Sequence, residues 1–148
     1  MKLRDLFGEE YETVDLQRKN LSTLEGQNIP EEVSGDFFCA NNNLTSLAHC
    51  PKIVKHDFDC SANNLSSLKD IHKQIKKVGG DFWCINNPIK SHILGLMLIE
   101  VDECIHTRLG NGSDVDEILN KWKNQGGRGA LGAQRELLDL GYEELARL

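Results

Sequence analysis

Three nine-residue stretches decide the fold of this chain: DFFCANNNL at residues 36–44, DFDCSANNL at 57–65 and DFWCINNPI at 81–89. Their leading aspartates stand at 36, 57 and 81, at spacings of 21 and then 24 residues, which indicates a repeat architecture. A shorter copy, VDLQRKNL at 14–21, precedes them and has Lys19 where the others have asparagine. Because the first coil of a solenoid has an open end, such a departure is typical of a capping repeat.

At the start of each copy an apolar residue recurs at every second position, as Phe37 and Cys39 do in the first of the three stretches. This period of two predicts a short strand with one buried face. Asn42, Asn63 and Asn87 follow the strands at equivalent positions. We expect their amides to turn inward and to bond backbone groups that the turn leaves unpaired, forming a ladder from coil to coil.

The residues between the buried positions point outward and form the candidate binding surface. They make two columns, one nearly all aspartate and one in which aspartate alternates with an aromatic residue. The predicted partner-binding residues are Asp15, Asp36, Phe38, Asp57, Asp59, Asp81, Trp83 and Ile85. Two structural alternatives stay open: the leading aspartates only bond neighbouring turns, and the two aromatic residues are buried under C-terminal helices.

The segments that return the chain to the next strand differ in length and pattern. Residues 24–33 and 47–54 are short and carry Pro30 and Pro51, which favours extended or 3₁₀ geometry. Leu68, Ile71, Ile75 and Val78 recur at helical spacing and predict a helix over residues 69–77 on the convex side. The lysines of that helix form either a solvated outer face or a phosphate-binding patch.

Residues 10–95 resemble the short leucine-rich repeats of bacterial secreted effectors. They resemble more closely the small cytoplasmic repeat proteins of tailed bacteriophages, whose copies read GDFxCxxNxLxSL. The resemblance implies an α/β fold: a leucine-rich-repeat solenoid of about four coils, with parallel strands on the concave face. It also implies a host-takeover or counter-defence role, in which the protein occupies and inhibits a host protein. The large ligase domain of such effectors does not fit in the residues that follow.

From Ser91 onward the pattern changes, and we expect helices that cap the solenoid. One broad helical face is predicted from Ile93, Leu94, Met97, Leu98, Val101, Cys104 and Ile105. Ser113 and Asp116 have the spacing of an N-terminal capping pair before a helix that runs to Trp122. Helices are also expected over residues 133–140 and 143–148. The predicted organisation is therefore a solenoid with an N-terminal cap at 1–90 and a helical cap region at 91–148.

Cysteine and glycine patterns indicate structure more than chemistry. Cys39, Cys60 and Cys84 share one column with Leu16, which predicts core thiols and no metal ladder. Cys50 and Cys104 receive the same interpretation, since His49, His56 and His106 do not stand beside them at ligand spacing. The motif GRGALG at 127–132 matches the G-x-G-x-x-G pattern of a nucleotide-binding loop, but it follows a helix and not a strand. It is interpreted as a flexible linker between helices, with an anion site as the alternative. No catalytic signature is present, and no metal or cofactor is expected.

Composition narrows the range of partners. The 148 residues include 17 Lys and Arg against 23 Asp and Glu, for a formal net charge of -6. Such an acidic chain is expected to repel nucleic acid. No apolar stretch is long enough to span a bilayer, and no signal peptide is recognised, so we expect no membrane partner and a cytoplasmic location.

These observations lead to two hypotheses about function. The first is a non-catalytic module that binds a host protein with a basic and apolar surface through the acidic and aromatic concave face. The alternative is a protein that binds or sequesters a small molecule in a cleft between that sheet and the helical cap. A cleft lined by Trp83, Asp59 and Asp81 would favour the alternative, and a broad open surface would favour the first hypothesis.

Overall fold

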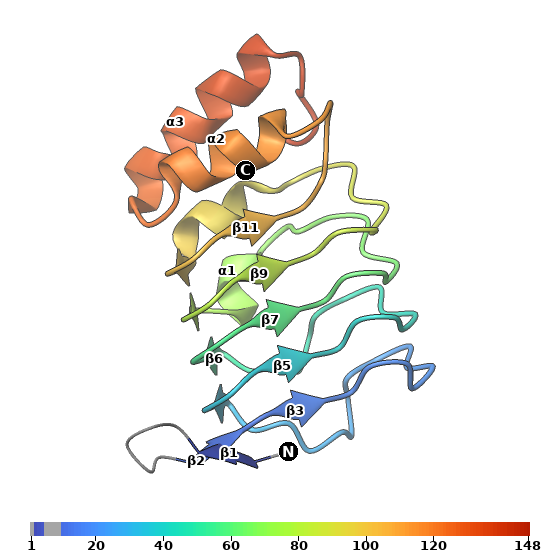
Figure 1. Cartoon of the computed structure of the whole chain (residues 1–148). Coiled ribbons are helices and arrows are strands. Elements are labelled where there is room, and N and C mark those ends of the chain that lie inside the picture. The colour runs from blue at the N-terminus through green and yellow to red at the C-terminus, as the bar shows by residue number, and fades with distance from the viewer. Residues whose placement is uncertain (1, 5–9) are drawn as a thin grey trace.

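The computed structural model describes residues 2–4 and 10–148, and in it the chain winds into a stack of parallel coils (Figure 1). Five short strands, one from each turn of the stack, pair in parallel and in chain order. They are β3 (Val14–Asp15), β5 (Phe37–Phe38), β7 (Phe58–Asp59), β9 (Phe82–Trp83) and β11 (Ile105–His106). The predicted parallel solenoid of about four coils, with helices at its C-terminal end, is confirmed.

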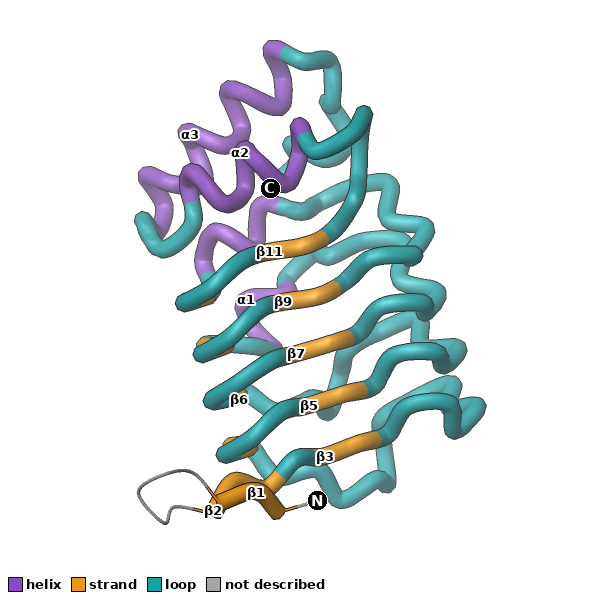
Figure 2. Tube along the Cα trace, in the orientation of Figure 1, coloured by secondary structure: helices purple, strands orange, loops and turns teal. Residues whose placement is uncertain are grey.

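A second parallel sheet, which the sequence pattern did not predict, lies one corner before the first. Its strands are β4 (Glu32–Val33), β6 (Ile53–Val54), β8 (Lys77–Val78) and β10 (Glu100–Val101). The corner between β8 and β9 requires glycine, because a Cβ atom on Gly79 would lie 2.1 Å from the carbonyl oxygen of Lys55. Between the strands the chain runs mostly in turns and loops, as Figure 2 shows.

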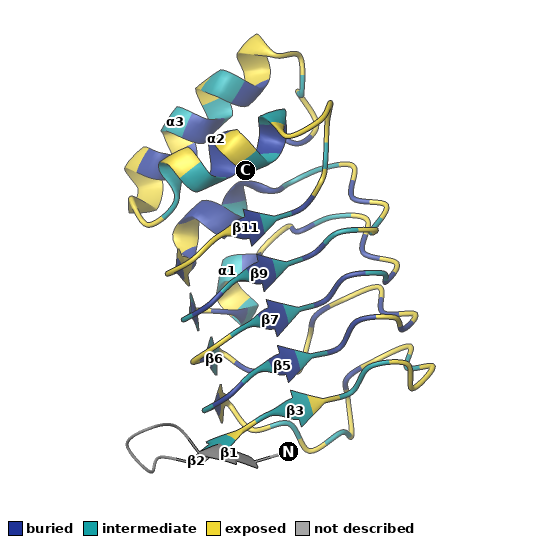
Figure 3. Cartoon of the chain, in the orientation of Figure 1, coloured by how far each residue is buried: buried dark blue, intermediate teal, exposed yellow. Residues whose placement is uncertain are grey.

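The core is the inner face of the five-stranded sheet (Figure 3). Phe37, Phe58 and Phe82 are completely buried, and their rings lie one above the next with centroids 5.1 and 5.4 Å apart. The cysteines two residues later in each coil are also buried. The alternation predicted for the strands is therefore confirmed, with the outward residue of each pair more exposed.

The asparagine ladder is confirmed. The Nδ2 group of Asn63 donates to the carbonyl oxygens of Cys39 and Cys60, and its Oδ1 accepts from the Leu44 amide at 3.0 Å. Asn42 and Asn87 make equivalent bonds to the coils before them. In the first four coils the residue before the ladder position has a left-handed φ between 53° and 58°: Arg18, Asn41, Ala62 and Asn86.

The predicted helix over residues 69–77 is wrong in extent. Helix α1 spans only Ile71–Gln74, and the chain becomes extended at Ile75. The amides of Lys76 and Lys77 instead donate to the Lys52 carbonyl oxygen in the coil before. The apolar residues that gave helical spacing are all buried, so tertiary pairing of the coil outweighs local helix propensity here.

The helix predicted over residues 93–105 is also wrong. A 3₁₀ helix, η1 (Leu94–Leu98), is followed by β10 and β11, which add a further strand to each sheet. Val101 pairs with Val78 and Ile105 with Phe82, so parallel pairing continues past residue 90. These residues keep the inward apolar positions of a repeat but lack its phenylalanine, cysteine and asparagine.

Two α-helices close the C-terminal end of the stack. Helix α2 (Asp114–Trp122) confirms the prediction. Helix α3 (Gly126–Asp139) contains all of residues 127–132, so the prediction that these form a flexible linker is wrong. Gly132 allows α3 to approach α2, because a Cβ atom there would lie 2.5 Å from the Trp122 ring. The helix expected at 143–148 is replaced by turns.

Ser113 and Asp116, predicted to be a capping pair at the start of α2, make other hydrogen bonds. The Ser113 hydroxyl donates to Glu117, and the Asp116 carboxylate accepts from the amides of Thr107 and Arg108. Asn120 on α2 bonds both backbone groups of Ile105, and Asn124, in the connection between α2 and α3, bonds both backbone groups of Val101. The helix and the connection after it thus supply the hydrogen bonds that a further coil would have made.

At the other end, β1 (Lys2–Arg4) and β2 (Glu10–Glu12) form an antiparallel pair beside the first coil. The Gly35 amide donates to the Glu12 carbonyl oxygen and joins this pair to the solenoid. Within the described residues, no helix has the length and apolar character needed to cross a membrane.

Candidate functional site: the outer face of the five-stranded sheet

The structure brings the predicted site residues together on the outer side of one sheet. We call this surface the outer sheet face, and it has two columns. The lead column, which stands just before the strands, is Thr13, Asp36, Asp57, Asp81 and Cys104; the outward column is Asp15, Phe38, Asp59, Trp83 and His106. Ile85 lies two residues beyond Trp83, is half-buried, and donates its amide to the Ser61 hydroxyl.

The lead aspartates form a second ladder. Asp36 Oδ1 accepts from the Asp57 amide at 2.9 Å, Asp57 Oδ1 from the Asp81 amide at 2.8 Å, and Asp81 Oδ1 from the Cys104 amide at 2.8 Å. Thr13 makes the equivalent bond to Asp36. These carboxylates therefore bond neighbouring turns, which was one of the open alternatives, and they remain half-buried on the surface.

The outward column is more open to a partner. The carboxylates of Asp15 and Asp59 each accept a hydrogen bond from the backbone amide two residues later. The turn closed by this bond fixes the direction of the carboxylate. Phe38 and Trp83 are half-buried, and Figure 1 shows α2 and α3 stacked beyond β11 instead of lying across this sheet. The indole of Trp83 stacks on the His106 ring, with centroids 3.8 Å apart and planes inclined by 14°.

Charge distinguishes this face from the neighbouring sheet. Across the second sheet and its flanks, Lys52 pairs with Glu31 at 3.0 Å, Lys55 with Glu32 at 3.2 Å, and Lys77 with Glu100 at 3.0 Å. The hydrogen bond from Lys77 to Glu100, together with Asp102 nearby, raises the pKa of Lys77.

On the outer sheet face, by contrast, three of the aspartates lack basic partners, and the only basic side chain of the described residues that Asp81 contacts is His106, at 3.5 Å. Asp36, Asp57 and Asp59 form no ion pair with a basic side chain of the described residues. The outer sheet face thus holds uncompensated negative charge, while the adjoining face is nearly balanced.

The thiols fall into two groups. Burial raises the pKa of Cys39 and Cys60 far above the ordinary value and raises that of Cys50 to about 12, so these thiols stay protonated. Cys104 is exposed, and the prediction that it is a core thiol is wrong, because it stands in the lead column and not in the buried cysteine column.

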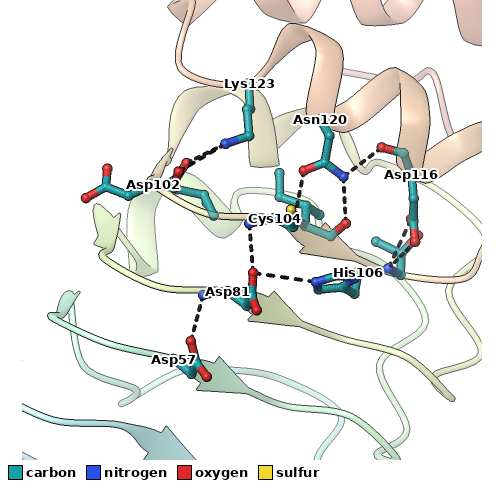
Figure 4. Close-up of polar contacts among 11 residues, drawn as sticks. Asp57, Asp81, Asp102, Cys104, His106, Asp116, Asn120 and Lys123 are labelled. Carbon is teal, nitrogen blue, oxygen red and sulfur yellow. Dashed lines mark hydrogen bonds and ion pairs between the residues drawn. The ribbon is translucent and has the colours of Figure 1, made fainter.

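The expectation that no histidine stands near Cys104 with suitable geometry is also wrong. Donor atoms of Asp81, Cys104 and His106 lie within 4.8 Å of one another (Figure 4). Sequence reasoning missed this group because the last strand was taken as helix. Aligning Val101 with Val78 would have placed Cys104 and His106 beside Asp81 and Trp83.

Two large cavities of the described residues lie away from this sheet. One, of about 590 Å³, lies between the return segments and is lined by Leu24, Pro30, His49, Cys50 and Lys73 among others. Another, of about 570 Å³, lies on the helical cap beside Trp122 and Leu131. Neither is lined by Asp59, Asp81 or Trp83, and α2 meets the five-stranded sheet at its edge.

The arrangement as a whole is an open surface with acidic groups around two aromatic side chains. Such a surface can bind by burying the aromatic rings and by attracting positive charge. Comparison with protein-family models, with curated proteins and with solved structures finds no match to this chain.

Proposed function

We propose that this chain is a non-catalytic binding protein whose outer sheet face engages a protein with a basic and apolar surface. The observation that carries the proposal is the outward column, in which half-exposed Phe38 and Trp83 alternate with the carboxylates of Asp15 and Asp59. Short strands fixed by two ladders hold these side chains on a rigid frame. Little ordering cost therefore opposes binding.

Each component has a distinct physical role. The aromatic rings supply apolar area with few rotatable bonds and act as the anchors of the interface. The unpaired carboxylates accelerate encounter with a positively charged partner and disfavour nucleic acid. Surface ion pairs neutralise much of the neighbouring face, so a charged partner is directed to the outer sheet face.

The resemblance to leucine-rich repeats of tailed bacteriophages extends this proposal. On that basis the partner is a host cytoplasmic protein, and occupation of its surface by the solenoid inhibits it in host takeover or counter-defence. Support comes from the repeat signature of residues 36–44, 57–65 and 81–89 and from the parallel coils that these residues form. This step rests on association with a family, because a fold does not fix a function.

The test is affinity capture from host lysate followed by measurement on the purified partner. The wild-type chain is compared with Phe38→Ala, Trp83→Ala and the double variant, each checked for folding by circular dichroism. The partner should be retained by the wild type and lost with the double variant. By surface plasmon resonance, Trp83→Ala should weaken binding by about 2 kcal/mol, mostly through faster dissociation.

Charge variants identify the face. Asp59→Lys should slow association and reduce its salt dependence, whereas charge reversal at Lys73 and Lys76, which lie outside the outer sheet face, should change neither. If the charge reversal at Lys73 and Lys76 abolishes binding while Trp83→Ala has no effect, the partner binds the segments that return the chain to the next strand. The proposed binding face would then be incorrect.

A further inference from the structure

The last two strands of the outer sheet face gather three different metal-binding side chains. Asp81 stands just before β9, Cys104 takes the equivalent position before β11, and His106 follows two residues later on β11. One oxygen, nitrogen or sulfur donor atom from each residue lies within 4.8 Å of the other two. Figure 4 shows the Asp81 carboxylate lying next to the His106 ring, with Cys104 adjoining.

From this geometry we propose that Asp81, Cys104 and His106 bind a divalent transition-metal ion, with zinc the best fit. A thiolate, an imidazole and a carboxylate are all zinc ligands, and the sulfur and nitrogen donors disfavour magnesium and calcium. Three protein ligands leave a fourth position for water or for a group of a partner. The proposal concerns this chain alone and does not depend on the proposed protein partner.

The donor atoms need only small movements to reach a zinc geometry. Zinc bonds of about 2.0–2.3 Å place tetrahedral donors roughly 3.3–3.6 Å apart. His106 Nε2 and Asp81 Oδ1 are already 3.5 Å apart, and their side chains are 31% and 30% exposed. The sulfur atom can approach by rotation about χ1, because Cys104 is exposed and is not packed in the core.

The Nε2 atom of His106 is directed at the Asp81 carboxylate. It is shielded from solvent, makes no hydrogen bond within the described residues, and has only an ion-pair contact of 3.5 Å with Asp81 Oδ1. A buried polar atom without a hydrogen bond is unfavourable. A metal ion between Nε2 and the Asp81 carboxylate would satisfy this nitrogen.

Neighbouring residues hold two of the ligands in place. Trp83 stacks on the imidazole of His106 and fixes the plane of the ring. The Asp81 amide donates to Asp57, and Asp81 Oδ1 accepts from the Cys104 amide, which orients the carboxylate. Oδ1 also faces His106 and keeps a further lone pair for the metal. Such support is typical of residues around a metal site.

The position of Cys104 also differs from that of the other cysteines. In each earlier coil, the lead-column residue has a side-chain oxygen that accepts a hydrogen bond from a backbone amide of the next coil. No further strand follows β11, and α2 bonds the Ile105 backbone instead. Cys104 therefore has neither the ladder role of its column nor the packing role of Cys39, Cys60 and Cys84. When the metal–sulfur bond forms, the thiol proton passes to buffer and the thiolate supplies the electron pair.

Cobalt and zinc titrations of the tag-free, full-length chain test the proposal. Added Co²⁺ should give the ultraviolet charge-transfer band of a cobalt–thiolate bond and visible bands of a four-coordinate ion, with one equivalent bound. Zn²⁺ should displace it. Cys104→Ser should remove the thiolate band, and both Cys104→Ser and His106→Gln should weaken zinc binding at least about tenfold. The exposed neighbour Glu103→Gln is the matched control and should bind as the wild type does.

A second readout is alkylation of Cys104 by iodoacetamide, located by peptide mass spectrometry. Zinc should slow this reaction at least about tenfold in the wild type and less in Asp81→Asn. Alkylation that proceeds equally with and without zinc, as expected of a free reactive thiol, would overturn the proposal. So would a cobalt–thiolate band that persists in Cys104→Ser, because another cysteine would then be the ligand.

Discussion

At the scale of single residues, stability depends on side chains that replace missing backbone partners. Asn63 is the clearest case, since it is buried and bonds carbonyl oxygens of two successive coils as well as the Leu44 amide. Asn63→Ala should lower the free energy of unfolding by about 1–3 kcal/mol, because buried backbone groups lose their partner. Urea unfolding followed by circular dichroism measures the change.

The matched controls are the exposed neighbour Asn64→Ala and the terminal Lys19→Ala, both of which should alter the free energy of unfolding by less than about 0.5 kcal/mol. Equal losses at positions 63 and 19 would contradict the register of the ladder. The sequence predicted this ladder because its asparagines recur in register. The aspartate ladder was left as one of two alternatives, since an outward carboxylate has the same spacing whether it bonds a turn or a ligand.

At the scale of elements, close packing explains a glycine motif that resembled a nucleotide-binding loop. The first turns of helix α3 contain the whole motif, and Gly132 faces the Trp122 ring, whose Nε1 donates to Glu136 at 3.0 Å. Gly132→Ala should destabilise the protein by about 1–3 kcal/mol, because the added Cβ atom overlaps the held indole. Thermal unfolding monitored by tryptophan fluorescence measures this effect.

Gly127→Ala is the matched change in the same helix. A Cβ atom at that position meets no atom within 4 Å, so the substitution should stabilise the helix by up to about 1 kcal/mol through reduced backbone freedom in the unfolded chain. Opposite signs for the two substitutions are the expected result. A gain at both positions would mean that α3 does not pack against Trp122 as described.

Predictability from sequence also varied by element. The strands at 37–38, 58–59 and 82–83 could be predicted because a buried phenylalanine and cysteine mark each one. Strand β11 could not be predicted, because Ile105 and Thr107 replace those residues. In addition, the groups that bond the edge of β11 facing away from β9 lie on α2. The group formed by Asp81, Cys104 and His106 was missed for the same reason, since it exists only when β11 pairs with β9.

At the scale of the whole molecule, a stack of parallel coils must terminate both sheets without leaving open edges. At the C-terminal end, Asn120 of α2 bonds both the amide and the carbonyl of Ile105, and Asn124, just after α2, bonds those of Val101. An edge strand without such cover is a template for pairing with another chain. Helix α2 therefore limits the length of the solenoid and opposes self-association.

The double variant Asn120→Ala/Asn124→Ala tests this role of α2. It should lower the free energy of unfolding by about 2–4 kcal/mol, because backbone groups at the ends of both sheets lose their partners under the helix. Partial release of α2 should also make the chain self-associate with rising concentration, as sedimentation velocity would show. Gln125→Ala, at an exposed position just after α2, should leave both quantities unchanged. A double variant that stays monomeric and loses no stability would show that apolar contacts alone cover the sheet ends, and that these two asparagines do not terminate the stack.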